Sequence, residues 1–180
     1  DRLSLLDQAI AYTGSGVARG RLDAASVSAM LGTVDRNRIQ ALCFELEEPA
    51  RLRLLLSRDG ALALESAPLP APFAGAARCI ALDHPTEAQD WRLRHKTTDR
   101  FFHDEALGVA RAAGAVEAVL VRDGLVTEGS WTNIFVERDG LLLTPPLALG
   151  LLPGVLRAQL LEQGRAREAD LQLDDLAGGF

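Results

Sequence analysis

The sequence predicts an α+β fold, in which a small N-terminal helical segment precedes a mixed α/β, strand-rich domain. Apolar residues recur at helical spacing up to about residue 44, whereas short apolar runs alternate with turn residues from Arg51 onward. Asp-Gly dipeptides, which favour hairpin turns, separate such runs at 59–60, 123–124 and 139–140. Helix-like stretches between these hairpins indicate that helices and strands share one domain.

The N-terminal segment, residues 1–47, is predicted to form helices at about 3–12, 23–31 and 35–44. Gly14-Ser15-Gly16 ends the first helix and Gly32 ends the second. Such a segment is too short to hold a core of its own.

Residues 48–73 are predicted to form a hairpin and a linker. The strands are expected at 51–56 and 61–65. The proline-rich run at 67–72 is incompatible with a central strand and favours an extended linker.

Residues 74–180 are expected to form the main domain. A helix over 104–113 should pack on a sheet through Ala106, Val109, Ala110 and Ala113. The other expected elements are a strand at 77–82, a loop at 86–92, hairpins at 117–121 with 125–127 and at 134–137 with 141–144, a helix from 154 to 163, a strand at 169–173 and the start of a helix at 174–176.

Composition excludes several classes of function. The net charge of -6 argues against nucleic-acid binding, and no run is long and apolar enough to span a membrane. Cys43 and Cys79 lack Cys-x-x-Cys spacing and are expected to be small buried hydrophobes in a reducing compartment, so we predict a cytoplasmic protein. The three histidines, His84, His95 and His103, lack metal-ligand spacing, so no metal site is predicted.

Residues 95–157 contain three groups of complementary chemistry. Lys96 is a carbonyl-reactive amine, Glu128 follows a strand and could hold a heterocyclic nitrogen, and Pro153-Gly154 opens a helix whose N-terminus could hold a phosphate. Pyridoxal phosphate requires these three fittings. Each is common alone, since a lone lysine is usually a solvated charge and Pro-Gly usually only starts a helix.

The order of these motifs resembles the class IV (fold type IV) pyridoxal-phosphate enzymes over residues 48–180, with the fold of the D-amino-acid aminotransferase-like large domain. The run His95-Lys96-Thr97-Thr98-Asp99-Arg100 and the turn Gly150-Leu151-Leu152-Pro153-Gly154 are most similar to aminodeoxychorismate lyase. The other matching pieces are Val126-Thr127-Glu128-Gly129, Asn133-Ile134-Phe135, Asp139-Gly140, Leu143-Thr144-Pro145-Pro146 and Val155-Leu156-Arg157.

The resemblance implies a lyase of folate biosynthesis that converts 4-amino-4-deoxychorismate to 4-aminobenzoate and pyruvate. Lys96 would be the catalytic Schiff-base lysine, and Glu128 would partner the pyridine nitrogen. Asn133 and the backbone of Gly154, Val155 and Leu156 would complete the cofactor site, with the backbone holding the phosphate.

Residues around the lysine leave alternatives open. Arg92, Arg94 and Arg100 could bind a substrate carboxylate, with Arg100 at a matching family position, or could be solvated charges. His95 could shape the lysine environment or be a polar residue at a strand end.

Residues 1–42 resemble a different family, the helical lid of the bacterial clamp-loader subunit tau/gamma of DNA polymerase III. No Gly-x-x-x-x-Gly-Lys-Ser/Thr loop is present, so ATP hydrolysis is not expected. Two resemblances that meet near residues 43–49 suggest a chimera whose lyase-like domain is truncated at both ends.

The alternatives are therefore a class IV aminotransferase, a non-catalytic chimeric or truncated protein of structural interest, and a clamp-loader fragment that binds replication subunits. The acidic charge disfavours the last. Exposed strand edges predict self-association, and the resemblance to a family whose members are commonly dimers also predicts a homodimer.

Overall fold

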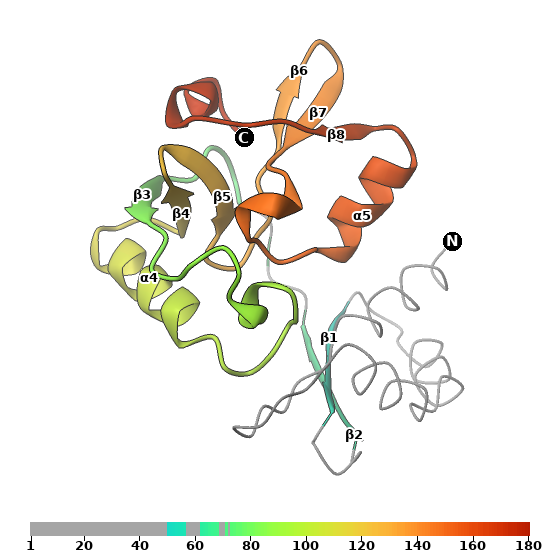
Figure 1. Cartoon of the computed structure of the whole chain (residues 1–180). Coiled ribbons are helices and arrows are strands. Elements are labelled where there is room, and N and C mark those ends of the chain that lie inside the picture. Colours follow the sequence, from blue (N-terminus) through green and yellow to red (C-terminus); the bar gives the residue numbers. More distant parts are fainter. Residues whose placement is uncertain (1–49, 57–61, 69–70, 72) are drawn as a thin grey trace. The chain divides into compact units, whose positions relative to one another are not determined.

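The computed structural model describes residues 50–56, 62–68, 71 and 73–180, and the helices predicted in residues 1–47 lie outside this part of the chain. The chain divides into two compact units. The first is Asp1–Pro72 with His95–Thr98, and the second is Phe73–Arg94 with Asp99–Phe180 (Figure 1). Among the described residues, none of the helices has the length and apolarity needed to cross a membrane.

The described part of the first unit contains the predicted hairpin. Strands β1 (Ala50–Leu56) and β2 (Leu62–Pro68) are antiparallel, with Ala50 opposite Pro68 and Leu56 opposite Leu62. The expected linker therefore begins later than predicted, because Ala67 and Pro68 end β2. A proline is tolerated there because both strands of a two-stranded sheet are edges.

The second unit begins with a three-stranded sheet in the order β3-β4-β5. Strand β3 (Cys79–Asp83) runs parallel to β4 (Glu117–Arg122), and helix α4 (Phe101–Ala112) lies between them in the chain. Strand β5 (Leu125–Gly129) returns antiparallel to β4. A short 3-10 helix, η1 (Trp91–Leu93), precedes α4.

A second three-stranded sheet, in the order β6-β7-β8, follows in the same unit. Strands β6 (Val136–Arg138) and β7 (Leu141–Thr144) form an antiparallel hairpin. Helix α5 (Val155–Glu162) leads to β8 (Ala166–Glu168), which is parallel to β7. Two further 3-10 helices are η2 (Leu147–Leu149) and η3 (Leu173–Leu176).

The predicted Asp-Gly turns form as expected in the second unit. Asp123 and Gly124 have φ of 51° and 79°, and Asp139 and Gly140 have φ of 54° and 77°. Positive φ at both central residues defines the turn type that matches the twist of paired strands. This confirms the hairpins predicted around residues 123–124 and 139–140.

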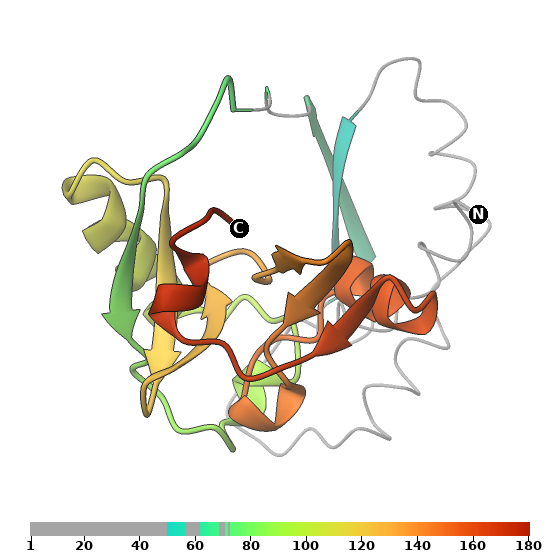
Figure 2. The ribbon, with the colours of Figure 1, turned by 90° about the horizontal axis from the view of Figure 1, so that it is seen from above.

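Two apolar clusters hold the second unit together. One joins the sheets through Val119, Val126, Ile134, Val136, Leu143 and Leu171. The other, Ala106, Ala110, Ala115, Ala118 and Leu120, packs α4 on β4. Figure 2 shows the sheets side by side, with α4 on the side of the first sheet away from the second.

Two sequence predictions in this unit are wrong. Val109 and Ala113 were expected to face the sheet, but Val109 is 47% exposed and Ala113, the C-cap residue, is exposed as well. The buried face of α4 is formed instead by Phe102 and His103 with Ala106 and Ala110. The strand predicted at 169–173 instead lies at Ala166–Glu168. Leu171 is buried, and its carbonyl accepts from Val126 N at 2.7 Å, so the apolar signal reflects one core contact rather than a ladder.

Candidate cofactor site

Strand β5 places an acidic side chain inside the second unit. The ladder between β4 and β5 pairs Leu120 with Glu128 and Val121 with Val126, and therefore skips Thr127. Such a bulge re-aims side chains. Thr127 Oγ1 donates to Leu120 O at 2.8 Å, and Glu128 is only 2% exposed.

The Glu128 carboxylate has partners on both oxygens. His103 Nε2 lies 2.9 Å from Oε1, and Leu152 N donates to Oε2 at 2.9 Å. Burial by itself would raise the pKa of Glu128, but the imidazoles of His103 and His84 together with the Leu152 N–H outweigh burial, and that pKa lies below its ordinary value. Glu128 is therefore an ionised, hydrogen-bonded acid in the interior.

His84 adds a second imidazole on the same side of Glu128. Its side chain is fully buried, and its Nε2 lies 3.8 Å from Glu128 Oε1. Because Thr86 N donates to His84 Nδ1 at 3.3 Å, we assign the imidazole proton to Nε2, which then faces the carboxylate. Both imidazoles therefore face Oε1 of Glu128, His103 at hydrogen-bond distance and His84 at 3.8 Å.

Asn133 connects the neighbourhood of Glu128 to the turn that opens α5. Asn133 Nδ2 donates to Leu152 O at 2.9 Å, while Leu152 N donates to Glu128. A Cβ on Gly154 would overlap Asn133 Oδ1, so a larger residue at that position would displace the Asn133 side chain. Leu152 therefore links Glu128, through its N–H, to Asn133, through its carbonyl, at the turn that opens α5.

The N-terminus of α5 provides backbone donors without a side-chain cap. Gly154 is the N-cap residue with φ of -66° and ψ of 147°, and no side chain caps the helix. The first N–H groups of a helix have no intrahelical partner, and the helix dipole favours an anion there. Gly154, Val155 and Leu156 can therefore present N–H groups to a phosphate.

Arg122 braces the loop before η1 against the loop after η2. Its guanidinium donates to Thr86 O at 2.6 Å, to Gly150 O at 3.3 Å and to Leu149 O. Gly150 has φ of 74°, and a Cβ there would come within 2.5 Å of the Ala88 backbone. This packing fixes the start of the segment that ends in the α5 turn.

Lys96 lies in the short segment His95–Thr98, which groups with the first unit. The structure accordingly brings Glu128, Asn133 and Gly154 together and does not place Lys96 relative to them. In the chain, Lys96 stands two residues after Arg94 and three before Asp99, both in the second unit.

Arg100 is engaged within the second unit. Its Nε donates to Asp104 Oδ1 at 2.7 Å, and its Nη2 donates to Ser130 O at 2.8 Å. Arg92 pairs with Asp90 at 2.6 Å and lies over the Phe102 ring. The arginines considered for substrate binding thus include two with intramolecular partners.

Sequence reasoning missed the imidazoles and the backbone partner of Glu128. His84 and His103 were considered only as metal ligands, and among the residues described no cluster of His, Cys, Asp and Glu suits a metal ion. A signal was available for His103, which lies on the inward face of α4 one turn before Ala106. None was available for His84, since its role depends on parallel pairing of β3 and β4.

A buried, hydrogen-bonded acid connected to a helix N-terminus is a set of groups that suits a protonated heterocycle carrying a phosphate. Residues 21–178 match the family described as amino-transferase class IV, and the chain belongs to that family. Membership supports pyridoxal phosphate as the cofactor, as the sequence predicts, and the donor set fits it. The match begins within residues 1–42, where the clamp-loader resemblance stays a prediction.

Some individual relatives are named as lyases and others as aminotransferases. The chain is 31% identical over 137 residues to a Schizosaccharomyces pombe protein provisionally named aminodeoxychorismate lyase, covering 72% of this chain and 59% of that protein. It is 35% identical to a crystal structure provisionally named amino-acid aminotransferase from Mesorhizobium loti, with a TM-score of 0.69, covering 84% of this chain and 77% of that one.

The pyridoxal-phosphate-bound form of a hypothetical aminotransferase from Mycobacterium tuberculosis shares the fold, at 23% identity and a TM-score of 0.66 over 83% of this chain and 64% of that one. The mixed α/β, strand-rich fold predicted from the sequence is therefore confirmed. The chain spans less than two thirds of the sequence relatives described, 59% in the case of the S. pombe protein.

Proposed function

We propose that this chain carries the cofactor site of a pyridoxal-phosphate-dependent lyase that converts 4-amino-4-deoxychorismate to 4-aminobenzoate and pyruvate. The observation that supports it best is the ionised, 2%-exposed Glu128, which is linked through Leu152 to the glycine turn that opens α5. The motif of residues 95–100 and the S. pombe relative favour the lyase reaction.

Each residue would have a separate role toward the cofactor. Glu128 would accept a hydrogen bond from the pyridine nitrogen and keep it protonated, since its pKa lies below the ordinary value. The N–H groups at the start of α5 would bind the phosphate, and Asn133 would hold their turn in place. When bound, pyridoxal phosphate withdraws electrons from the carbon next to the reacting amine.

Lys96 would bind the cofactor covalently and then move protons. Lys96 is two residues after Arg94 and three before Asp99 in the sequence, and both of those residues belong to the second unit. Its freed amine would remove the proton from the ring carbon bearing the substrate amine. Breakage of the bond to the enolpyruvyl oxygen then makes the ring aromatic, and the departing group takes up a proton to become pyruvate.

Arg100 is the proposed contact for a substrate carboxylate. Its guanidinium already bonds Asp104 and the Ser130 carbonyl, so a substrate would share that guanidinium or displace Asp104. Arg100 is the N-cap residue of α4, and its guanidinium contacts the loop that follows Glu128 within the same unit as the acid.

A class IV aminotransferase is the second candidate. The M. loti structure favours it, because the identity of 35% extends over 84% of this chain. Both reactions use the same cofactor fittings and the same first proton removal, so the choice depends on the substrate.

The test is a parallel assay of the chain loaded with pyridoxal phosphate. Incubation with 4-amino-4-deoxychorismate should release 4-aminobenzoate, detected by fluorescence, and an equal amount of pyruvate. Incubation with amino acids and 2-oxoglutarate should release no glutamate. Lys96→Arg, which keeps the charge of the sole lysine, should abolish product. Release of glutamate without 4-aminobenzoate would favour the aminotransferase. Release of neither compound would favour the non-catalytic alternative.

A further inference from the structure

A second buried carboxylate, Glu117, lies beneath the loop that carries the cofactor-site residues. This site loop, residues 129–133, begins directly after Glu128 and ends at Asn133. Glu117 is the first residue of β4 and is only 4% exposed. It takes no part in the site described above.

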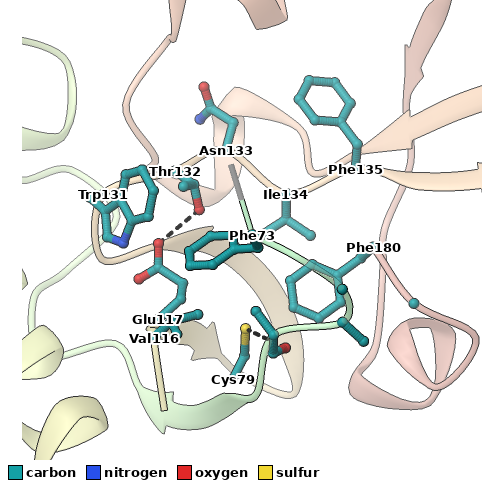
Figure 3. Close-up of a pocket in the computed structure, with 14 residues that line it drawn as sticks. Phe73, Cys79, Val116, Glu117, Trp131, Thr132, Asn133, Ile134, Phe135 and Phe180 are labelled. Atoms are coloured by element: carbon teal, nitrogen blue, oxygen red, sulfur yellow. Dashed lines mark hydrogen bonds between the residues drawn. The ribbon is translucent and has the colours of Figure 1, made fainter. Parts of the chain in front are cut away.

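The Glu117 carboxylate receives hydrogen bonds from the site loop on both oxygens. Oε1 accepts from Ser130 N at 2.8 Å, from Ser130 Oγ and from Ala118 N at 2.9 Å. Oε2 accepts from Thr132 Oγ1 at 3.0 Å. Figure 3 shows this last bond at the wall of a cavity of about 430 Å³ that Glu117, Thr132 and Asn133 help to line.

The loop is folded tightly onto this carboxylate. Gly129 N donates to Thr132 O at 2.8 Å and closes a turn. A Cβ on Gly129 would overlap Thr132 Oγ1 and would lie 2.8 Å from Glu117 Oε2. A larger residue at position 129 would therefore displace the Thr132 and Glu117 side chains.

The other face of the loop contacts the α5 turn. Asn133 follows Thr132 directly, donates to Leu152 O and lies against Gly154. Leu152 N in turn donates to Glu128. Glu117 and Thr132 thus support one side of the segment that connects Glu128 to the N-terminus of α5.

We propose that Glu117 is a positioning residue of the cofactor site. It acts through the Thr132 hydroxyl, which holds Asn133 against the Leu152–Gly154 turn and so sets the α5 N-terminus relative to Glu128. The proposal rests on the proposed function of that site. Neither the family match nor the named relatives assign a role to Glu117.

Charge makes the carboxylate suited to this role. A buried carboxylate accepts from several N–H and O–H groups at once, whereas an amide would turn an NH2 group toward one of those donors. In this structure the Glu117 carboxylate accepts hydrogen bonds from the N–H groups of Ala118 and Ser130 and from the hydroxyls of Ser130 and Thr132.

The experiment compares Thr132→Val, which removes the hydroxyl at constant shape, with Thr132→Ser, which keeps it. Hydrogen exchange of segments 129–133 and 152–156 is measured in the cofactor-free chain, and pyridoxal phosphate affinity is measured by absorbance titration. We expect Thr132→Val to exchange faster in both segments and to bind about tenfold more weakly, as loss of a hydrogen bond to a charged group implies. Thr132→Ser should match the wild type.

Two results would overturn the proposal. One is unchanged exchange and affinity in Thr132→Val, and the other is an equal loss in Thr132→Ser, which would show that the hydroxyl is not responsible. If Glu117→Gln folds, it should show faster hydrogen exchange and weaker pyridoxal phosphate binding than Thr132→Val. A wild type that fails to bind pyridoxal phosphate would refute the proposed function, and the exchange measurement alone would then decide whether Glu117 positions the loop.

Discussion

Replacement of Glu128 by glutamine tests the core of the site, because it changes charge and hydrogen bonding at constant shape. In the wild type, one oxygen faces His103 and the other accepts from Leu152 N. Glutamine has only one oxygen, so its NH2 group must face either the Leu152 N–H or the His103 ring, which would have to change tautomer to accept from it. At 2% exposure, water cannot supply the missing acceptor.

The expected loss of stability follows from these contacts. A hydrogen bond to a charged group contributes about 1.5–3 kcal/mol, and a buried donor left without a partner costs about 1–3 kcal/mol. Because the ionised acid also loses its own burial cost, we expect a net loss of about 2–4 kcal/mol. For a chain of this size that corresponds to a Tm lower by about 5–15 °C.

Urea unfolding and thermal melts of the cofactor-free chain measure this effect. Glu105→Gln is the matched control, since Glu105 is exposed on α4, and it should stay within about 0.5 kcal/mol of the wild type. The reasoning would be refuted if Glu128→Gln were as stable as this control.

Acid unfolding carries the same information with a defined sign. The pKa of Glu128 is lower in the folded chain than its ordinary value, so the unfolded chain takes up its proton first as pH falls. The stability that Glu128 contributes is therefore present above about pH 4.3 and is lost as pH falls through the folded pKa. In urea unfolding measured at a series of pH values, Glu128→Gln should lack this loss of stability as pH falls.

Gly150→Ala should destabilise the chain by about 2–4 kcal/mol in urea unfolding, because it combines a φ of 74° with a Cβ 2.5 Å from the Ala88 backbone. Gly164→Ala, with φ of 67° in open space, should cost only about 1 kcal/mol, and equal losses would contradict the packing. Burial, with the charge of Glu117, raises the pKa of the Cys79 thiol, so iodoacetamide should label Cys79 slowly at pH 7.5 and faster as pH rises. Labelling at the rate of a free thiol would contradict that environment.

Local signals made most of the second unit predictable. The hairpins follow from Asp123-Gly124 and Asp139-Gly140, which adopt the positive φ that such turns need. Strand β8 was misplaced because Leu171 carries the apolar signal although it contacts the core outside any ladder. Short strands are defined by their partners, which a single stretch of sequence does not show.

The candidate site was only partly predictable for the same reason. Glu128 and Gly154 belong to recognisable sequence blocks, and the structure joins them through Leu152. His103 and Glu117 depend on contacts with residues 25 and 13 positions away, and their types alone indicate no role. Buried polar partners of this kind follow from the fold rather than from a motif.

The most direct test of the account is a titration of the whole chain with pyridoxal phosphate, followed by borohydride reduction and mass measurement. Lys96 is the sole lysine, so a specific adduct maps to one peptide. The account predicts a saturable absorbance shift and one reduced adduct on Lys96, both much weaker in Glu128→Gln. Labelling without an absorbance shift, or labelling that is equal in Glu128→Gln, would contradict the claim that Lys96 and Glu128 form one cofactor site.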